Sequence, residues 1–226
     1  NIIKEKKLDK DTYKAKSIKN RISSLKNNFI TVENYFNNSE LIEVDKAAKR
    51  DLFGEIYQEY VRRCFKASVM DFDDLLLKTN ELLNKSPETL LKYQQKFKYI
   101  LVDEYQDTNY SQYLIVKALA DRHENLCVVG DDSQSIYSFR GANIDNILNF
   151  KKHYPDCKTY KLEQNYRSSN NIVQCANSLI QNNQFKLDKT IWTQNSDGEK
   201  INANEWLLDL ITGKPQSFDS PFIRIT

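Results

Sequence analysis

The stretch Tyr99-Ile-Leu-Val-Asp-Glu-Tyr-Gln-Asp-Thr108 is the most informative part of the sequence, because a short apolar run there ends in two adjacent carboxylates. The run up to Val102 predicts a strand that is buried on both faces of a parallel sheet. Asp103 and Glu104 follow it directly, as acids do in α/β domains that hold Mg²⁺ and a water beside a phosphate. The stretch therefore indicates phosphoryl chemistry at the carboxyl edge of a sheet.

The sequence after about residue 97 predicts a parallel α/β sheet, because short apolar runs alternate there with amphipathic segments. We expect strands at 98–102, 125–129 and 158–162. We expect helices at 111–121, at 144–153 with Asn143 as its cap, and after Ser168-Ser169-Asn170-Asn171. A polar loop follows each strand, and such loops meet at one edge of an open sheet.

The first 95 residues are predicted to be helical, since they contain one glycine, Gly54, and apolar residues at helical spacing. Two stripes are expected in the core: Ile18, Ile22, Leu25 and Phe29, and then Ala48, Leu52, Ile56, Tyr60 and Cys64. Asp71 is a candidate cap for a helix that carries Phe72, Leu75, Leu76, Leu82 and Leu83. Pro87 is placed as the first residue of the next helix.

Composition limits the class of protein. The 226 residues are 40% hydrophobic, which is enough for a real core, and the formal net charge is only +2. The basic residues gather in residues 1–30, where nine Lys or Arg stand against three acids. That end fits either a nucleic-acid backbone or a set of solvated helix faces, and the sequence leaves both readings open.

The remaining composition argues against several kinds of site. The four cysteines are far apart, which disfavours a disulfide framework and a zinc site. No run of about 18 apolar residues and no signal-peptide core is present, so we expect a soluble, cytoplasmic protein with no membrane partner. Met70 is the single Met, which suggests a piece of a longer protein.

Two further segments carry residues suited to phosphate and base recognition. In Val129 to Ala142, the neutral amide of Gln134 can sense a terminal phosphate, and the faces of Tyr137 and Phe139 beside Arg140 can stack on unpaired bases. In Leu162 to Ser169, Arg167 can neutralise charge on a transferred phosphoryl group and Tyr166 can stack on a purine. Taken singly, a core-packing loop explains the first segment equally well, and a Tyr-Arg pair like that of the second is more often a surface cation-π or salt-bridge pair.

Taken together, the order VDEYQDTN, VVGDDSQSIYSFRGA, LEQNYRSS resembles motifs II, III and IV of superfamily 1 DNA helicases of the UvrD, Rep and PcrA type. The resemblance implies an α/β fold with a partial RecA-like parallel sheet of the P-loop NTPase type and a helical inserted subdomain. It places that subdomain at 1–70 and the C-terminal part of the first RecA-like domain at 71–183. Residues 184–226 stay unassigned, as a possible start or remnant of the second RecA-like domain.

The resemblance also implies roles for individual residues. Asp103 coordinates Mg²⁺, Glu104 activates the attacking water, and Gln134 contacts the γ-phosphate of ATP and links it to DNA. Tyr166 stacks on the adenine and Arg167 is an arginine finger. Phe139 stands where the family usually has Trp and is the base-stacking platform, assisted by Tyr137 and Arg140. The partners implied are single-stranded and duplex DNA, and the activity is unwinding of duplex driven by ATP hydrolysis.

The phosphate cradle of such enzymes is missing from this sequence. The pattern GxxxxGK[ST] requires two glycines five positions apart, and no pair among the five glycines has that spacing. No equivalent of motifs V and VI is found either, so the chain is interpreted as a fragment that lacks the remainder of the helicase chain. We expect the fragment alone to be inactive, because it has no preorganised donors for the triphosphate.

Two other functions remain open at this point. The chain is alternatively a single-stranded nucleic-acid binding module without catalysis, using the basic N-terminal end and the Phe139 loop. A less favoured alternative is a metal-dependent nuclease with Asp103, Glu104, Asp131 and Asp132 as a two-metal cluster.

Overall fold

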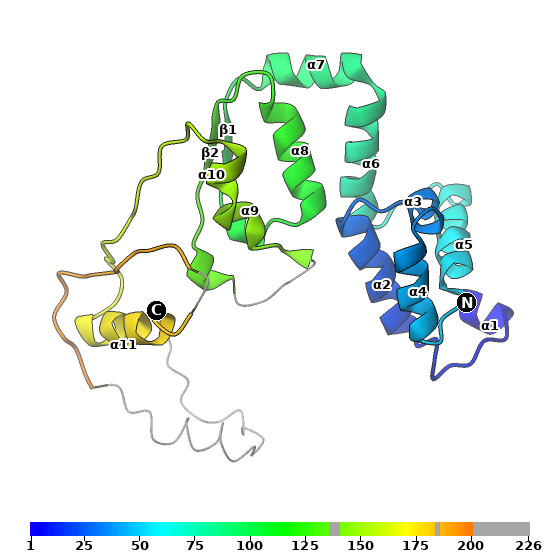
Figure 1. The fold of residues 1–226 in the computed structure, drawn as a ribbon, viewed down its shortest axis with the longest axis horizontal. Coiled ribbons are helices and arrows are strands. Elements are labelled where there is room, and N and C mark those ends of the chain that lie inside the picture. The colour runs from blue at the N-terminus through cyan, green and yellow to red at the C-terminus, as the bar shows by residue number, and fades with distance from the viewer. Residues whose placement is uncertain (136–140, 184–185, 201–226) are drawn as a thin grey trace. The chain divides into compact units, whose positions relative to one another are not determined.

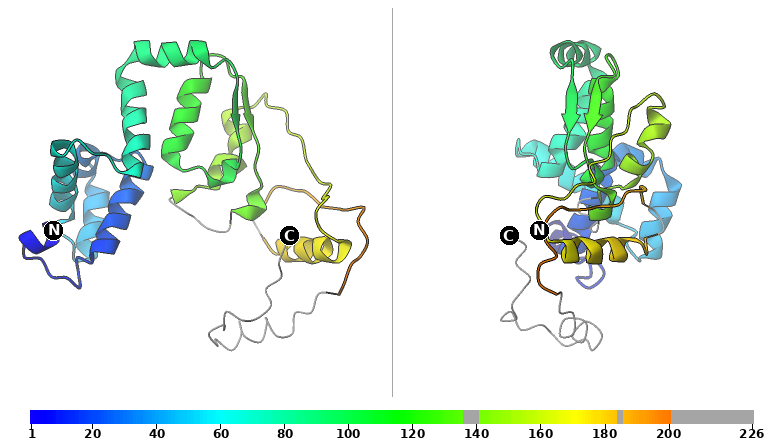
Figure 2. Two further views of the ribbon diagram at one scale, coloured as in Figure 1. Left: turned by 180° about the vertical axis from the view of Figure 1, so that it is seen from behind. Right: turned by 90° about the vertical axis from the view of Figure 1, so that its left-hand side faces the viewer.

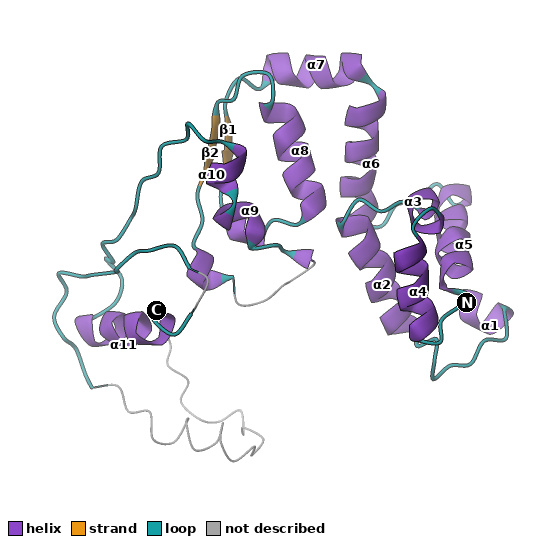
Figure 3. Ribbon diagram, in the orientation of Figure 1, coloured by secondary structure: helices purple, strands orange, loops and turns teal. Residues whose placement is uncertain are grey.

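The computed structural model describes residues 1–135, 141–183 and 186–200. The chain divides into two compact units, Asn1–Cys157 and Lys158–Thr226, which are described separately below. Helices account for most of the regular structure in the described residues (Figure 3). None of the helices in the described ranges is long and apolar enough to cross a membrane.

The N-terminal part of the first unit is a cluster of helices, coloured blue to cyan in Figure 1. Its helices are α1 (Ile2–Glu5), α2 (Ala15–Asn27), α3 (Val32–Phe36), α4 (Ser39–Ala47) and α5 (Phe53–Lys66). Ile18, Ile22 and Leu25 of α2 belong to one buried cluster with residues of α5, which confirms three of the four positions of the first predicted stripe. Phe29 is only half-buried, because it follows the end of α2 with a left-handed φ of 57°.

The second predicted stripe, from Ala48 to Cys64, is only partly right. Ile56 is buried, but Ala48 is exposed at the end of α4, because the chain turns through a left-handed Lys49 before α5 begins. The side chains that fill the core are instead Phe53 and Tyr57, both 0% exposed. Gly54 allows this packing, since a Cβ there would lie 2.8 Å from the rings of Tyr35 and Phe36.

Two helices connect the helical cluster to the sheet: α6 (Phe72–Lys85) and α7 (Pro87–Lys96). The predicted starts of both are confirmed, because Asp71 forms a capping box with Asp74 and Pro87 is the first residue of α7. The buried face of α6 carries Leu77, Asn80 and Leu83. Of the apolar residues named for this helix, Phe72, Leu75 and Leu82 are exposed, since they lie outside the face that packs against α2 and α8.

The sheet has two parallel strands in the described residues, β1 (Ile100–Val102) and β2 (Leu126–Val128), paired in the register Ile100 with Leu126 (Figure 2). The helix between them, α8 (Tyr110–Ala120), begins at a capping box formed by Asn109 and packs on β1. The strand was predicted to be buried on both faces, and this is wrong: Leu101 is 77% exposed and its partner Cys127 is exposed. Alternate residues of a strand face opposite sides, so α8 covers only one of them.

The first unit ends in short helices. The two strands are followed by the 3₁₀ turns η1 (Tyr105–Asp107) and η2 (Asp132–Gln134). The helix predicted at 144–153 is two helices, α9 (Asp145–Leu148) and α10 (Phe150–His153), separated at Asn149. The N-cap of α9 is Ile144 and not the predicted Asn143. The side chain of Asn143, one residue earlier, accepts a hydrogen bond from the backbone N–H of Asp145 at 2.9 Å and so holds the start of the helix.

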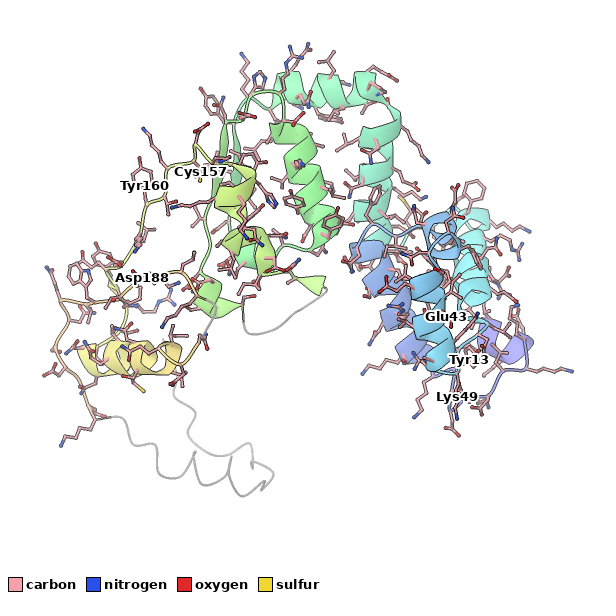
Figure 4. The ribbon with its side chains drawn as sticks, in the orientation of Figure 1. Tyr13, Glu43, Lys49, Cys157, Tyr160 and Asp188 are labelled. Atoms are coloured by element: carbon pink, nitrogen blue, oxygen red, sulfur yellow. The ribbon has the colours of Figure 1, made fainter. Side chains whose placement is uncertain are left out.

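The second unit contains the predicted helix after Ser169, α11 (Asn170–Ile180). The strand predicted at 158–162 is wrong, because these residues form no regular element and Tyr160 and Leu162 are exposed. Figure 4 labels Tyr160 on this extended segment. A strand requires a hydrogen-bonded neighbour, and no described strand pairs with this segment. The sequence also contains a helix-like run from Trp206 to Ile211, but this run lies outside the described residues.

Candidate active site

Asp103 and Glu104 lie at the carboxyl end of β1, where the sequence predicts them, and both side chains are exposed. Glu104 has φ 50° and ψ 41°, a left-handed conformation that costs free energy for a residue with a side chain. The strands hold it there, because Tyr105 donates its backbone N–H to the carbonyl of Val129 at 2.9 Å. Sheet pairing therefore turns the chain sharply at Glu104.

The two carboxylates are held by neutral donors. Asp103 Oδ1 accepts the backbone N–H of Glu104 at 2.9 Å, and Glu104 Oε2 accepts Nε2 of Gln106 at 2.8 Å. No Lys or Arg side chain of the described residues forms an ion pair with either acid. Each acid therefore has one carboxylate oxygen without a protein partner in the described part of the chain.

Gln106 has a place in this site that the sequence reasoning did not assign. It is 1% exposed, and its Oε1 accepts the backbone N–H of Asp131 at 2.9 Å while its Nε2 binds Glu104. It therefore joins the loop after β1 to the loop after β2. Its position two residues after Glu104 was a weak signal, since a polar residue in a turn is ordinarily solvated.

Gln134 lies in η2, at the same edge of the sheet, and is exposed. Its Nε2 donates to Asp131 Oδ2 at 2.9 Å, and Asp131 Oδ1 accepts the backbone N–H of Ser133 at 3.0 Å. Hydrogen bonds thus run from Glu104 through Gln106 and Asp131 to Gln134. The structure brings together three of the predicted site residues: Asp103, Glu104 and Gln134.

A buried aromatic side chain, that of Tyr105, contributes to the packing at this edge of the sheet. Tyr105 is 1% exposed and packs edge to face on Phe150, with ring centroids 5.7 Å apart. Burial raises the pKa of Tyr105 to about 12, with smaller contributions from Tyr154 and Tyr113. Its phenol therefore stays neutral across the physiological range, and it packs as an apolar support rather than titrating with the carboxylates.

The end of the same stretch contacts the helical cluster. Asn109 Nδ2 donates to Asn27 Oδ1 of α2 at 2.7 Å, and the carbonyl of Thr108 accepts the N–H of Asn143 at 3.0 Å and Nδ2 of Asn146 at 3.0 Å. Tyr137, Phe139 and Arg140 lie outside the described residues, which resume at Gly141. Thr108 and Asn109 thus form hydrogen bonds with α2 and with the residues that follow the predicted base-stacking loop.

The oxygen ligands at this edge are suited to a single Mg²⁺ ion and not to a cluster of two metal ions. Mg²⁺ is typically held by one or two carboxylates, waters and substrate phosphates, and Asp103 offers one such oxygen. No three acidic, His or Cys side chains converge to hold a metal in the described ranges. The two-metal cluster of Asp103, Glu104, Asp131 and Asp132 therefore finds no support, since Asp131 is committed to Ser133 and Gln134.

Tyr166 and Arg167 belong to the second unit, in a loop whose backbone is held by several hydrogen bonds. Asn165 Oδ1 accepts the backbone N–H groups of Arg167 and Ser168 at 2.9 and 2.8 Å, and Asn165 donates its own N–H to the carbonyl of Trp192 at 2.7 Å. Both site side chains are exposed, and Tyr166 donates its hydroxyl to Gln164 Oε1 at 2.8 Å. The loop thus presents an aromatic face and a guanidinium to solvent.

Comparison with known proteins agrees with this arrangement. The family description "UvrD/REP helicase N-terminal domain" matches residues 1–155, and "UvrD-like helicase C-terminal domain" matches residues 160–206. The chain is 46% identical over 200 residues to the ATP-dependent DNA helicase PcrA of Bacillus subtilis, covering 88% of this chain and 26% of that protein.

Two further relatives carry the same name. PcrA of Staphylococcus epidermidis is 44% identical over 207 residues, covering 90% of this chain and 27% of the relative. PcrA of Leuconostoc citreum is 42% identical over 200 residues, covering 88% and 26%. The chain thus spans about a quarter of the length of the relatives it matches. On the match to residues 1–155, with both acids of the motif at the end of β1, the chain belongs to the UvrD/REP helicase family.

Proposed function

We propose that this chain is the part of an ATP-dependent DNA helicase that places the water-activating and phosphate-sensing groups at one edge of a RecA-like sheet. The observation that carries the proposal is the hydrogen-bonded series from Glu104 through Gln106 and Asp131 to Gln134. The complete enzyme would translocate on single-stranded DNA and unwind duplex. The division at residues 70 and 183 into inserted subdomain, first RecA-like domain and remainder stays a prediction.

Each predicted site residue would have a separate role in ATP hydrolysis. Asp103 would hold Mg²⁺, which neutralises phosphate charge when bound. Glu104 would orient the attacking water and accept its proton, which requires an exposed carboxylate with one unused oxygen. Gln134 would contact the terminal phosphate of ATP, Arg167 would stabilise the charge that develops on it, and Tyr166 would stack on the adenine.

The decisive experiment measures ATP turnover of the complete gene product with and without single-stranded DNA. Glu104→Gln removes the proton acceptor but keeps the shape of the side chain, so we expect turnover to fall by about 10²-fold or more. Glu124→Gln is the matched control, because Glu124 is also exposed and also left-handed, with φ 52°, but lies between α8 and β2. Full turnover in Glu104→Gln would contradict the proposal.

The isolated chain tests a separate part of the proposal. Because it contains no GxxxxGK[ST] sequence, we expect no ATP turnover from it even with single-stranded DNA present. DNA-stimulated turnover by the isolated chain, abolished by Glu104→Gln, would overturn this expectation.

Nucleic-acid binding without catalysis is the second candidate, and the basic residues of the N-terminal end favour it. Of the nine in residues 1–30, Lys6, Arg21 and Lys26 are engaged in ion pairs. The other six are exposed: Lys4, Lys7, Lys10, Lys14, Lys16 and Lys19. Binding of the isolated chain to an oligonucleotide that weakens steeply with salt, and weakens further in Phe139→Ala, would support this function.

A further inference from the structure

Gln106 is a buried polar side chain whose amide oxygen and amide nitrogen form hydrogen bonds with two different loops. A buried carboxamide must satisfy both its acceptor and its donor end, and Gln106 does so entirely within the protein. Its partners also fix its orientation. The backbone N–H of Asp131 can only donate and a carboxylate can only accept, so Oε1 faces Asp131 and Nε2 faces Glu104.

The chain around Gln106 is shaped to admit it. A Cβ added to Gly130 would lie 2.6 Å from Gln106 Oε1 and 2.9 Å from Ile147 Cδ1, both closer than real contacts permit. Gly130 has no left-handed backbone conformation in this structure, so space and not φ requires a glycine there. Glycine at 130 therefore lets the loop after β2 approach the amide of Gln106.

The bond to Glu104 sets which oxygen of that acid is available. Gln106 Nε2 donates a hydrogen bond to Glu104 Oε2, and this bond holds the carboxylate in place. The backbone of Glu104 is itself in a strained left-handed conformation. On the other side, the N–H that Gln106 accepts belongs to Asp131, whose carboxylate holds both the turn at Ser133 and the amide of Gln134. A shift of Gln106 would thus move both groups together.

We propose that Gln106 is the positioning residue that keeps Glu104 and Gln134 in one fixed geometry, so that water activation takes place only when the phosphate-sensing loop is in place. This inference rests on the proposed function. Both ends of the Gln106 amide bind protein groups, so Gln106 acts through Glu104 and Asp131.

The test measures kcat and KM for ATP with the complete gene product and single-stranded DNA. In Gln106→Ala we expect kcat to fall by about 10- to 100-fold, as is typical when a group that orients a catalytic side chain is lost, with KM nearly unchanged. Gln94→Ala is the matched control: Gln94 is a buried glutamine whose Nε2 donates to the carbonyl of Ala118 at 2.8 Å, away from this edge. Equal kcat in Gln106→Ala and wild type would overturn the inference.

Gln106→Glu gives a readout that a merely structural role would not change. An ionised carboxyl at position 106 would repel Glu104, whereas a protonated one would again donate a hydrogen bond to it. We therefore expect the kcat of Gln106→Glu, relative to wild type, to recover as the pH is lowered from 8 toward 6. A ratio that stays constant with pH would overturn the inference, even if Gln106→Ala fails to fold.

The outcomes separate this inference from the proposed function. If wild type shows no DNA-stimulated turnover, or if Glu104→Gln retains it, the proposed function fails. If Glu104→Gln is inactive while both Gln106 variants match wild type, only the positioning role fails. Amide hydrogen exchange at Asp131, expected to quicken in Gln106→Ala, checks the hydrogen bond in the isolated chain without any activity.

Discussion

Two clusters of acidic residues in the first unit have opposite electrostatic surroundings. Lys26 is 0% exposed, and its Nζ lies 2.7 Å from Asp71 Oδ2 and 2.8 Å from Asp74 Oδ1. Asp103 and Glu104 are exposed and receive only neutral donors from the described residues.

The difference separates acids with a structural role from the two acids that we propose to be functional. Buried charges are tolerated only when they are paired and hydrogen-bonded, and the Lys26 cluster meets that condition with Tyr60, whose hydroxyl donates to Asp71 at 2.8 Å. Exposed acids at the end of a strand, held by neutral donors and by no ion pair in the described residues, have an oxygen available for a cation or a water. The following predictions test this contrast, from the largest expected effect to the smallest.

Removal of the buried cation should have the largest effect on stability. In Lys26→Met, Asp71 and Asp74 keep their negative charges without a counter-charge, so we expect the free energy of unfolding to fall by about 3 to 5 kcal/mol. Urea denaturation of the isolated first unit, or of the chain, measures this. Lys19→Met, an exposed position on the same helix, should change it by less than about 0.5 kcal/mol. Equal effects of the two substitutions would mean that Lys26 is not a structural cation.

Gly130→Ala should destabilise the site edge without removing any charge. The added methyl would overlap Gln106 Oε1 and Ile147 Cδ1, and we expect a loss of about 1 to 3 kcal/mol in the free energy of unfolding. Gln106→Ala removes one of the overlapped groups. The double variant should therefore lose less than the sum of the two single losses, and strict additivity would contradict the predicted overlap.

The pH dependence of stability should depend on Asp71. Burial alone would raise the pKa of its carboxyl, but hydrogen bonds from Lys26 and Tyr60 outweigh burial and lower the pKa below 3.8. A group whose pKa is lowered by folding stabilises the folded state above its unfolded value, and this contribution disappears as the pH falls through the folded value. We expect stability to decline below about pH 3.8, and to decline less steeply in Asp71→Asn. An unchanged slope in that variant, measured by denaturation across pH 2 to 5, would contradict the assignment.

Glu104→Gln should have the smallest effect on stability of these substitutions. The side chain is exposed, and a carboxamide oxygen can still accept the bond from Gln106, so we expect a change below about 0.5 kcal/mol in the free energy of unfolding. The same substitution is the one expected to abolish ATP turnover of the complete gene product. A large loss of stability would place Glu104 with the structural acids and erase the contrast with the Lys26 cluster.

Local signals predicted several helix starts correctly, whereas a turn between two helices and the pairing of strands were predicted wrongly. The cap at Asp71 and the proline at Pro87 act through their own turn of chain, so their effect can be read from neighbouring residues. Ala48 was assigned to the core because its spacing to Ile56 is helical, but the chain turns at Lys49 and breaks that periodicity. The segment 158–162 has strand-like residues, yet no described strand pairs with it.

The family was already indicated by the sequence, because its three motifs appear directly in the order of residues, and the sequence also put two acids directly after β1. It also showed that the phosphate cradle is missing from this chain. Only the tertiary structure decided that Gln106 joins the two loops and that Lys26 is a buried structural cation. Both depend on contacts between residues 25 or more positions apart, which adjacency in the sequence cannot show because they arise only when the helices and strands pack.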